Sequence, residues 1–289
     1  MTSPADVHPI TAEVLARFAA TPDARLREIM ASLIRHLHGF ARDVKLTESE
    51  WFEAIGFLTA VGQKCDATRQ EFILLSDTLG LSMVMTDLND AKPPGCTEPT
   101  VFGPFHVEDA PRYELGADIA AGAPGEPCRV QGRVLGLDGA PVAGAELDVW
   151  QADAEGFYDV QRPELEAAQA RGRLRADAQG RFAFWTIVAE AYPVPSDGPV
   201  GRMLAATGRH PWRPAHLHFM ITAPGYQRLI THVFRRGGDY LDSDAVFGVR
   251  PSLIADWIRH EPGTAPDGTR RDTPWWSLDF DFVLNRTAE

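Results

Sequence analysis

Cysteine is scarce in this sequence and long apolar runs are missing, and each shortage argues against a class of protein. The three cysteines, Cys65, Cys96 and Cys128, are odd in number and far apart, so they predict neither a disulfide scaffold nor a zinc knuckle. No apolar stretch approaches the roughly 20 residues that cross a bilayer. Residues 1–8 lack the basic and apolar segments of a signal peptide. We expect a cytoplasmic protein with no membrane partner.

Positive charge is also in short supply. The 289 residues include 28 lysines and arginines against 40 acidic residues, and the formal net charge at pH 7 is -12. A protein that binds nucleic acid needs a basic surface for the phosphates, so no nucleic acid partner is expected. The hydrophobic share of 44% is that of an ordinary globular protein, and the length suits one large domain or two smaller ones.

Glycine is rare in the first hundred residues, which hold only 5 of the 25 glycines, and the apolar pattern there is helical. One stripe recurs at steps of three or four residues: Leu26, Ile29, Leu33 and Leu37. Thr47 and Glu50 have the spacing of a capping box at the start of another helix, and a further helix is predicted over 71–85. These stripes are either packing faces or a contact between two subunits. We predict a helical region over residues 1–97.

From about residue 98 the pattern changes to short strands and turns. Alternation over 129–135, the turn at Asp138–Gly139 and alternation over 145–149 predict a hairpin. A second hairpin is predicted from 173–176 to 182–184, and two more strands over 216–222 and 229–234. Several short strands at this spacing are typical of a β-sandwich. The fold class expected is α+β: a helical region over 1–97, then a mainly β-sandwich catalytic domain over 98–289.

The most informative motif lies on one of these strands. His216 and His218 are two residues apart, so on a strand both rings point to the same face and can bind one metal ion. Leu217 and Phe219 would then point the opposite way, into a core. The alternative is a pair of histidines that bind no metal, because such a motif is only a hypothesis by itself.

Five segments, in this order, resemble the intradiol ring-cleavage dioxygenases, which are non-haem ferric enzymes that open catechol-type rings. They are 101–105 (VFGPF), 148–152 (DVWQA), 156–159 (GFYD), 192–195 (YPVP) and 213–218 (RPAHLH). The resemblance extends over almost the whole chain, including the N-terminal helical region through which members of this family dimerise. It implies an enzyme of aromatic catabolism that uses O2, forms a homodimer and binds a phospholipid between the N-terminal helices.

The resemblance implies four ligands to one Fe(III) per subunit: Tyr158, Tyr192, His216 and His218. Phenolate is a hard anionic donor and imidazole suits iron. Free tyrosine has a pKa near ~10, so the metal itself must stabilise the phenolate. Each tyrosine could instead be a buried ring with a hydrogen-bonded hydroxyl. Zinc is the chemical alternative to iron, although zinc sites favour cysteine, histidine and carboxylate.

Two further residues receive roles from the resemblance. Arg213 would lie over the bound ring and stabilise negative charge on the carbon that oxygen attacks. Tyr192 would leave the metal and accept a substrate proton. The sequence departs from the family at His232, where catechol-cleaving members often have glutamine; this histidine either hydrogen-bonds near the oxygen site or only packs. The product would be a muconate-type dicarboxylate.

The positions that correspond to the substrate pocket of the family are Leu74, Asp77, Val101, Phe102, Gly103, Pro104, Phe105, Val194, Pro195 and Val246, with His232 beside them. Asp77 is informative, because a carboxylate in an apolar pocket needs a hydrogen-bond donor from the substrate. The third hydroxyl of hydroxyquinol (benzene-1,2,4-triol) would supply that donor. The alternative for Asp77 is a solvated helix residue.

Two other functions remain open from the sequence. The first is cleavage of catechol or chlorocatechol by the same chemistry. The second is a binding module without catalysis, because residues 132–149 also resemble transthyretin-like and carboxypeptidase-regulatory β-sandwich modules. Such a module would not need Tyr158, Tyr192 or the histidine pair.

Overall fold

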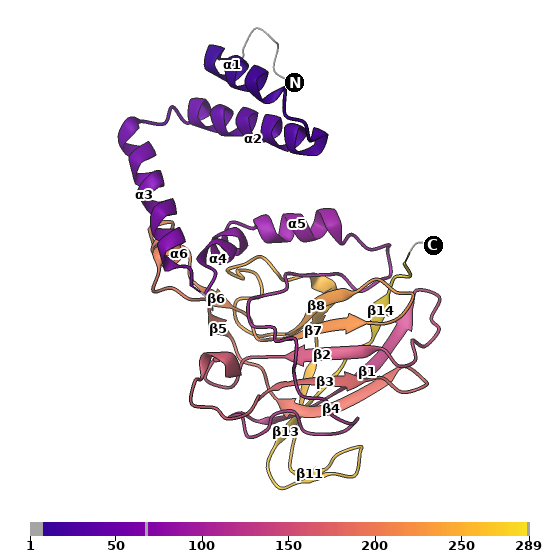
Figure 1. The fold of residues 1–289 in the computed structure, drawn as a ribbon. Helices are drawn as coiled ribbons and strands as arrows, with labels where there is room; N and C mark the ends of the chain where they lie inside the picture. Colours follow the sequence, from indigo (N-terminus) through magenta and orange to yellow (C-terminus); the bar gives the residue numbers. More distant parts are fainter. Residues whose placement is uncertain (1–7, 67–68, 288–289) are drawn as a thin grey trace. The chain divides into compact units, whose positions relative to one another are not determined.

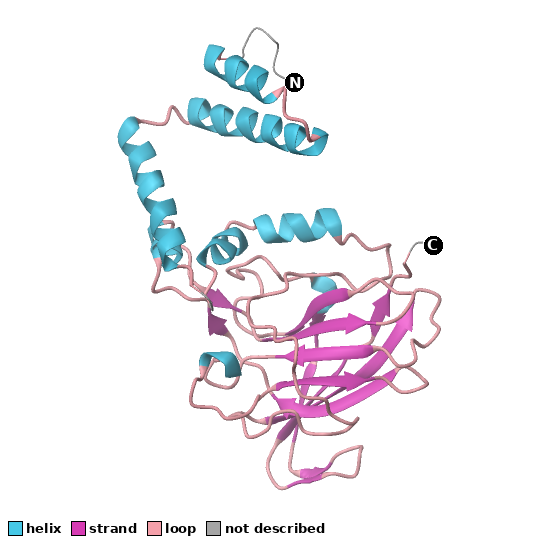
Figure 2. Ribbon diagram, viewed as in Figure 1, coloured by secondary structure: helices cyan, strands magenta, loops and turns pink. Residues whose placement is uncertain are grey.

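The structure is a computed structural model that describes residues 8–66 and 69–287 (Figures 1 and 2). Contacts within the chain form two compact units, Met1–Ala60 and Val61–Glu289. The division falls inside helix α3 (Glu48–Lys64). The domain boundary predicted at residues 97/98 separates helical from strand-rich sequence instead, and it stays a prediction.

The first unit contains α1 (Pro9–Phe18), α2 (Ala24–Asp43) and most of α3. Asp23 caps α2 by accepting a hydrogen bond from the Leu26 amide at 2.8 Å. The capping box predicted before α3 is confirmed. The Thr47 amide donates to the Glu50 carboxylate at 2.8 Å, and the Glu50 amide donates to the Thr47 hydroxyl at 3.3 Å.

The apolar stripe of α2 is not covered by the described residues of the first unit. Leu26, Ile29, Leu33 and Leu37 are 47–54% exposed, and no residue of α2 is buried. An amphipathic helix normally buries its apolar face against a partner, and the described part of the first unit does not supply one for this stripe. None of the described helices has both the length and the apolarity needed to cross a membrane.

The second unit starts with two helices where the sequence predicted one over 71–85, and that prediction is wrong. α4 (Glu71–Thr78) ends near Gly80, and α5 (Leu81–Asn89) begins after it. Gly80 has a φ of 75°, a left-handed conformation that ends helices and that glycine adopts without steric cost. The predicted single face is therefore divided: Leu75 and Met83 are buried, whereas Phe72 and Leu79 are exposed.

Two five-stranded sheets form the body of the second unit (Figure 2). The first has the order β3 (Arg171–Arg175), β2 (Glu146–Trp150), β7 (His216–Thr222), β8 (Leu229–Arg235) and β9 (Ile254–Ala255). The second has the order β10 (Trp257–His260), β13 (Trp275–Asp279), β1 (Pro127–Gly136) and β14 (Phe282–Leu284), with β4 (Arg181–Ile187) also paired to β1. Two strand pairs lie outside the sheets: β5 (Tyr192–Pro193) with β6 (Trp212–Arg213), and β11 (Gly263–Thr264) with β12 (Arg270–Arg271).

Both predicted hairpins are wrong in their pairing, although their turns form. β1 pairs with β4, β13 and β14, whereas β2 pairs with β3 and β7. The turn at Asp138–Gly139 therefore leads from one sheet to the other, and so does the turn between β3 and β4. Alternation in a strand determines which face is buried, but it does not determine the neighbouring strand.

Aromatic side chains from both sheets meet in the core between them. The ring of Phe219 on β7 lies 4.7 Å from that of Phe282 and 6.3 Å from that of Phe182, which belong to the opposite sheet. Leu217 and Phe219 are fully buried in this core, as predicted. Because side chains alternate along a strand, His216 and His218 point to the other face of the sheet.

Candidate metal centre

The two histidines of β7 meet two tyrosines on the outer face of the first sheet. Tyr158 precedes the 3-10 helix η2 (Asp159–Gln161), and its amide is held by the Gln161 side chain at 2.9 Å. Tyr192 lies on β5, directly opposite Arg213 on β6. All four side chains are buried. The four residues predicted as metal ligands therefore come from three separate parts of the fold to one place.

The donor atoms of these side chains form a chain of short contacts. Tyr192 Oη lies 3.2 Å from Tyr158 Oη, Tyr158 Oη lies 2.8 Å from His218 Nε2, and His218 Nε2 lies 3.1 Å from His216 Nε2. Ligands about 2.0–2.2 Å from one ion have neighbours at roughly this separation. The donor atoms thus have the spacing of one coordination sphere.

The tautomer of His216 is set by the backbone. Its Nδ1 lies 2.7 Å from the Pro214 carbonyl, and a carbonyl can only accept, so Nδ1 carries the proton. Nε2 then carries no proton, and its lone pair, which can bind a metal ion, faces the other three groups. Such an orienting bond to the second ring nitrogen is typical of histidines that bind metals.

Burial keeps the histidines uncharged. It lowers the pKa of His216 to about 3, with the charge of Arg213 acting in the same direction. Burial also lowers the pKa of His218 well below its ordinary value, helped by His232 and His216. Neutral imidazole is the form that binds a metal.

The hydroxyl group of Tyr158 would need a nearby cation to lose its proton in this buried site. Burial raises the pKa of Tyr158 well above its ordinary value, and the neighbouring Tyr192 raises it further, against the opposing charges of Arg213 and Arg171. Two phenol groups, a bare imidazole nitrogen and little water make a site where a bound metal ion would stabilise phenolate. The residues present fit a metal ion.

Aromatic packing holds two of these rings from behind. Trp150 stacks on His218 with ring centroids 4.8 Å apart, and Phe105 stacks on Tyr158 at 4.4 Å. Gly103 adopts a φ of 76°, and a Cβ there would lie 3.1 Å from Cε1 of His218. Only glycine combines that backbone conformation with that close approach. The segment 101–105 therefore supports the site as well as bordering it.

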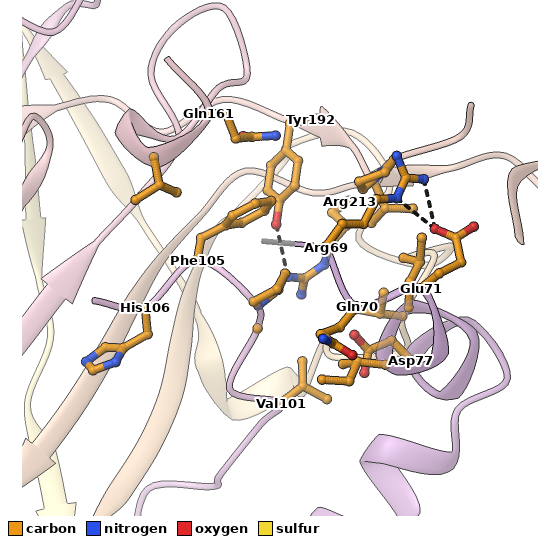
Figure 3. Close-up of a pocket in the computed structure, with 18 residues that line it drawn as sticks. Arg69, Gln70, Glu71, Asp77, Val101, Phe105, His106, Gln161, Tyr192 and Arg213 are labelled. Carbon is orange, nitrogen blue, oxygen red and sulfur yellow. Dashed lines mark hydrogen bonds and ion pairs between the residues drawn. The ribbon is translucent and has the colours of Figure 1, made fainter. Parts of the chain in front are cut away.

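Arg213 brings a fixed positive charge to the site. Its Nη1 lies 3.4 Å from Tyr192 Oη (Figure 3). The same nitrogen lies 3.2 Å from His216 Nε2. Burial opposes its charge, but Asp244 and Tyr192 outweigh that effect and raise the pKa of the guanidinium. Arg213 therefore stays charged in a place from which water is largely removed, where electrostatic interactions are strong.

His232 lies behind the paired histidines on the neighbouring strand β8, opposite His218. Potential ligand atoms of His216, His218 and His232 all lie within 4.8 Å of one another. Its Nδ1 is 3.4 Å from Nη2 of Arg213, and its ring does not line the adjacent cavity among the described residues. Its predicted role beside the substrate stays a prediction.

A cavity of about 520 Å³ opens beside Tyr192 and Arg213 (Figure 3). Its walls include these residues of the predicted pocket: Leu74, Asp77, Val101, Gly103, Pro104, Phe105, Val194, Pro195 and Val246. Phe102 is not part of the wall and packs instead against His106 and Trp150. Asp77 is only 7% exposed, so its interpretation as a solvated helix residue is wrong.

Sequence reasoning missed several residues of this cavity: Arg69, Gln70, Glu71, Ile73, His106, Val160 and Gln161. All of them are near predicted site residues in the sequence, so proximity was the available signal. It also missed Asp244, whose carboxylate forms an ion pair with Arg213 at 3.1 Å. Asp244 is 31 residues from its partner, and nothing in its local sequence sets it apart from other acidic residues.

Comparison with known proteins gives one consistent family. Residues 101–286 match the family model described as Dioxygenase, and residues 23–97 match Catechol dioxygenase N terminus. The chain is 65% identical over 282 residues to 6-chlorohydroxyquinol 1,2-dioxygenase of Cupriavidus pinatubonensis, covering 98% of each. It is 53% identical over 272 residues to hydroxyquinol 1,2-dioxygenase of Nocardioides simplex, covering 94% of this chain and 92% of that protein. The crystal structure of hydroxyquinol 1,2-dioxygenase from Pseudomonas putida has a TM-score of 0.91 and 49% identity, and the match covers 96% of this chain and 98% of that one.

Removal of one donor should empty this centre of metal. We expect His218→Ala to reduce the metal content per chain by at least about tenfold, because loss of a ligand weakens binding more than loss of a supporting group does. Elemental analysis of purified protein measures it. His260→Ala is the matched control, since His260 bonds Ser277 on the other sheet. Wild-type metal content in His218→Ala would contradict the assignment of the centre.

Proposed function

The chain belongs to the intradiol ring-cleavage dioxygenases, and we propose that it opens the ring of hydroxyquinol (benzene-1,2,4-triol) with O2. The product is 3-hydroxy-cis,cis-muconate, which tautomerises to maleylacetate. All the electrons that reduce O2 come from the ring, so no external reductant takes part. The observation that carries the proposal is the meeting of two tyrosine oxygens and two histidine nitrogens at contacts of 2.8–3.2 Å beside a cavity with a buried arginine.

We infer that the metal is one Fe(III) per subunit, held by Tyr158, Tyr192, His216 and His218. Two phenolates and two neutral imidazoles suit a hard trivalent ion and stabilise its oxidised state. When bound, ferric iron would take both adjacent hydroxyl oxygens of the substrate and draw electron density from the ring. The donor chemistry supports iron over zinc, because zinc sites favour thiolate, imidazole and carboxylate.

The side chains around the cavity divide the remaining work. Tyr192 borders both the metal centre and the cavity, so its oxygen is placed to accept a proton from an incoming hydroxyl group. Arg213 presents a permanent charge to the same space and would stabilise negative charge on the ring carbon that O2 attacks. The apolar walls formed by Val101, Val194 and Val246 exclude water from the reacting ring.

Asp77 supports a triol over a diol as the substrate. Burial raises the pKa of its carboxyl group, against a hydrogen bond from Ser82 and the charge of Arg213. One such hydrogen bond leaves other acceptor positions of the carboxyl group unpaired toward the cavity, which is costly unless a ligand donates to them. The third hydroxyl of hydroxyquinol would make that hydrogen bond, and catechol has no group to make it. The relatives from Cupriavidus and Nocardioides are named for the triol or its chloro derivative, which supports the same choice.

Two alternative functions do not explain all the side chains of the site. Cleavage of catechol or chlorocatechol uses the same metal chemistry but gives Asp77 no hydrogen-bond donor from the substrate. A binding module without catalysis accounts for the sandwich alone, and it gives no reason for Arg213 and the four donor side chains to be buried together.

We infer that the enzyme is a homodimer joined through its N-terminal helices. The exposed stripe of Leu26, Ile29, Leu33 and Leu37 supports this, because a contiguous apolar face on a soluble protein marks an interaction site. The same surface suits the acyl chains of a phospholipid, which mass spectrometry of an organic extract would detect.

We infer that the enzyme is cytoplasmic. A cytoplasmic location suits the three unpaired thiols, since they would stay reduced there; cell fractionation tests it.

Substitution of Asp77 should change specificity more than it changes chemistry. We expect Asp77→Ala to lower kcat/KM for hydroxyquinol by about 10–100-fold, the range expected when a buried polar contact is lost. The loss for catechol should be several times smaller. Oxygen uptake with hydroxyquinol, 6-chlorohydroxyquinol and catechol gives the three values side by side.

Asp87→Ala is the matched control for this comparison, because Asp87 is an exposed carboxylate on α5 that pairs with Arg250. Its three rates should remain at wild-type values. Equal losses on hydroxyquinol and catechol in Asp77→Ala would remove Asp77 as the discriminating residue. A wild-type preference for catechol would overturn the proposed substrate.

A charge on the exposed stripe should dissociate the dimer. The double variant Leu33→Glu with Leu37→Glu replaces two leucines that the proposed interface would bury with carboxylates that have no partner there, which is costly in a packed interface. Sedimentation velocity should change from dimer to monomer at micromolar concentration. Leu137→Glu places the same charge on an exposed leucine of the sheet-rich unit and should remain dimeric. A double variant that stays dimeric refutes the inferred contact.

A further inference from the structure

The guanidinium of Arg213 rests on a single buried carboxylate. Asp244 Oδ1 accepts from Nε of Arg213 at 3.1 Å, and Asp244 Oδ2 accepts from Nη2 at 3.3 Å. Both side chains are almost fully buried, with 3% and 2% of their areas exposed. A two-point contact of this kind fixes the plane of a guanidinium as well as its position. Nη1 is left free of the carboxylate.

The free nitrogen is the one that faces the candidate centre. Nη1 lies 3.4 Å from Tyr192 Oη and 3.2 Å from His216 Nε2. Nε and Nη2 are occupied by Asp244, and Nη2 also lies 3.4 Å from His232 Nδ1. The ion pair therefore orients the guanidinium so that one edge faces the carboxylate and the opposite nitrogen faces the site.

Asp244 also organises the loop on which it sits. Its Oδ2 accepts from the Gly248 amide at 2.9 Å and its Oδ1 from the Val246 amide at 3.3 Å. Phe247, between these two residues, has a φ of 60°, which is unusual for a bulky side chain and requires support from its surroundings. Val246 lines the cavity. The same carboxylate thus holds the arginine and one wall of the pocket.

The backbone of Gly248 packs closely against the ion pair between Arg213 and Asp244. A Cβ at Gly248 would lie 3.0 Å from Nη2 of Arg213 and 3.1 Å from Oδ2 of Asp244. Those separations are shorter than ordinary van der Waals contacts, so any larger residue would require the ion pair to shift by a few tenths of an ångström. The glycine permits the close approach of backbone to guanidinium.

We propose that Asp244, with Gly248, is the positioning site for Arg213 in the ring-opening reaction. Asp244 is not among the residues that line the cavity. It acts through Arg213, by holding the guanidinium in the plane and at the depth from which Nη1 reaches the reacting ring. This inference rests on the proposed function, because it takes Arg213 as the catalytic arginine. A misplacement of about 1 Å in such a group can reduce turnover by about a hundredfold.

Asp244→Asn in the metal-loaded enzyme tests the proposal. Asparagine has nearly the same shape, but it lacks the charge and keeps only one acceptor oxygen. It can therefore accept from only one of the two loop amides, and its NH2 group turns donors toward the guanidinium. We expect kcat for hydroxyquinol to fall by about 10–100-fold, while the Kd from anaerobic titration with hydroxyquinol and the metal content stay within about threefold of wild type. A variant damaged only in folding would lose metal and substrate binding together with turnover.

A double-variant comparison identifies the route of the effect. If Asp244 acts only through Arg213, then Arg213→Ala with Asp244→Asn should be no slower than Arg213→Ala alone. Gly248→Ala supplies a second test from the other side, because the added methyl group pushes on the guanidinium without altering any charge. It should also lower kcat with little change in Kd.

Asp148→Asn is the matched control, because Asp148 is a buried carboxylate that pairs with Arg173 at 2.8 Å and lies outside the cavity. It should retain wild-type kcat. Wild-type kcat in Asp244→Asn, or a double variant at least about tenfold slower than Arg213→Ala, overturns the positioning role while leaving the proposed function intact. Wild-type turnover in Arg213→Ala overturns the catalytic role of the arginine, and the positioning role with it.

Discussion

The alternation of β7 is the constraint on which the site depends. Leu217 and Phe219 are locked into the core between the two sheets, and a strand cannot rotate one side chain without moving its neighbours to the wrong face. The core therefore holds His216 and His218 on the outer face. Trp150 on β2 stacks on His218, and the Pro214 carbonyl orients His216. The free energy gained by burying Leu217 and Phe219 therefore also keeps the ring nitrogens of His216 and His218 in place.

Electrostatics then determine what this arrangement can bind. Two phenol groups and three neutral imidazoles lie together with the permanent charge of Arg213, and Asp244 is the carboxylate paired with it. Burial opposes the charged form of each of Tyr158, His216 and His218. A metal cation would reverse that balance for Tyr158, because it supplies the positive charge that a buried phenolate needs. The cavity beside it is lined by two buried acidic side chains: Glu71, which pairs with Arg69, and Asp77, which we propose distinguishes a triol from a diol.

The sequence predicted what is local or carried by a motif. The capping box at Thr47 and the strand with His216 and His218 lie in short segments whose residue types suffice to identify them. Most walls of the cavity were predicted from the resemblance to a known family. The pairing of β1 and β2 with other strands could not be predicted, because the turns at Asp138 and Asp177 look the same whether the chain returns within a sheet or crosses to the other. The break at Gly80 and the pairing of Arg213 with Asp244 depend on contacts distant in the sequence or on backbone conformation. Those contacts leave no periodic signal.

Resonance Raman spectroscopy of the protein loaded with ferric iron, excited in its visible band, tests the central claim most directly. Tyrosinate bound to Fe(III) gives a red-brown charge-transfer band and enhanced phenolate ring vibrations. The account predicts both, with the vibrations of one phenolate lost in Tyr158→Phe and those of the other in Tyr192→Phe. A colourless iron-loaded protein, or a spectrum that neither substitution alters, would contradict a ferric centre held by these two tyrosines.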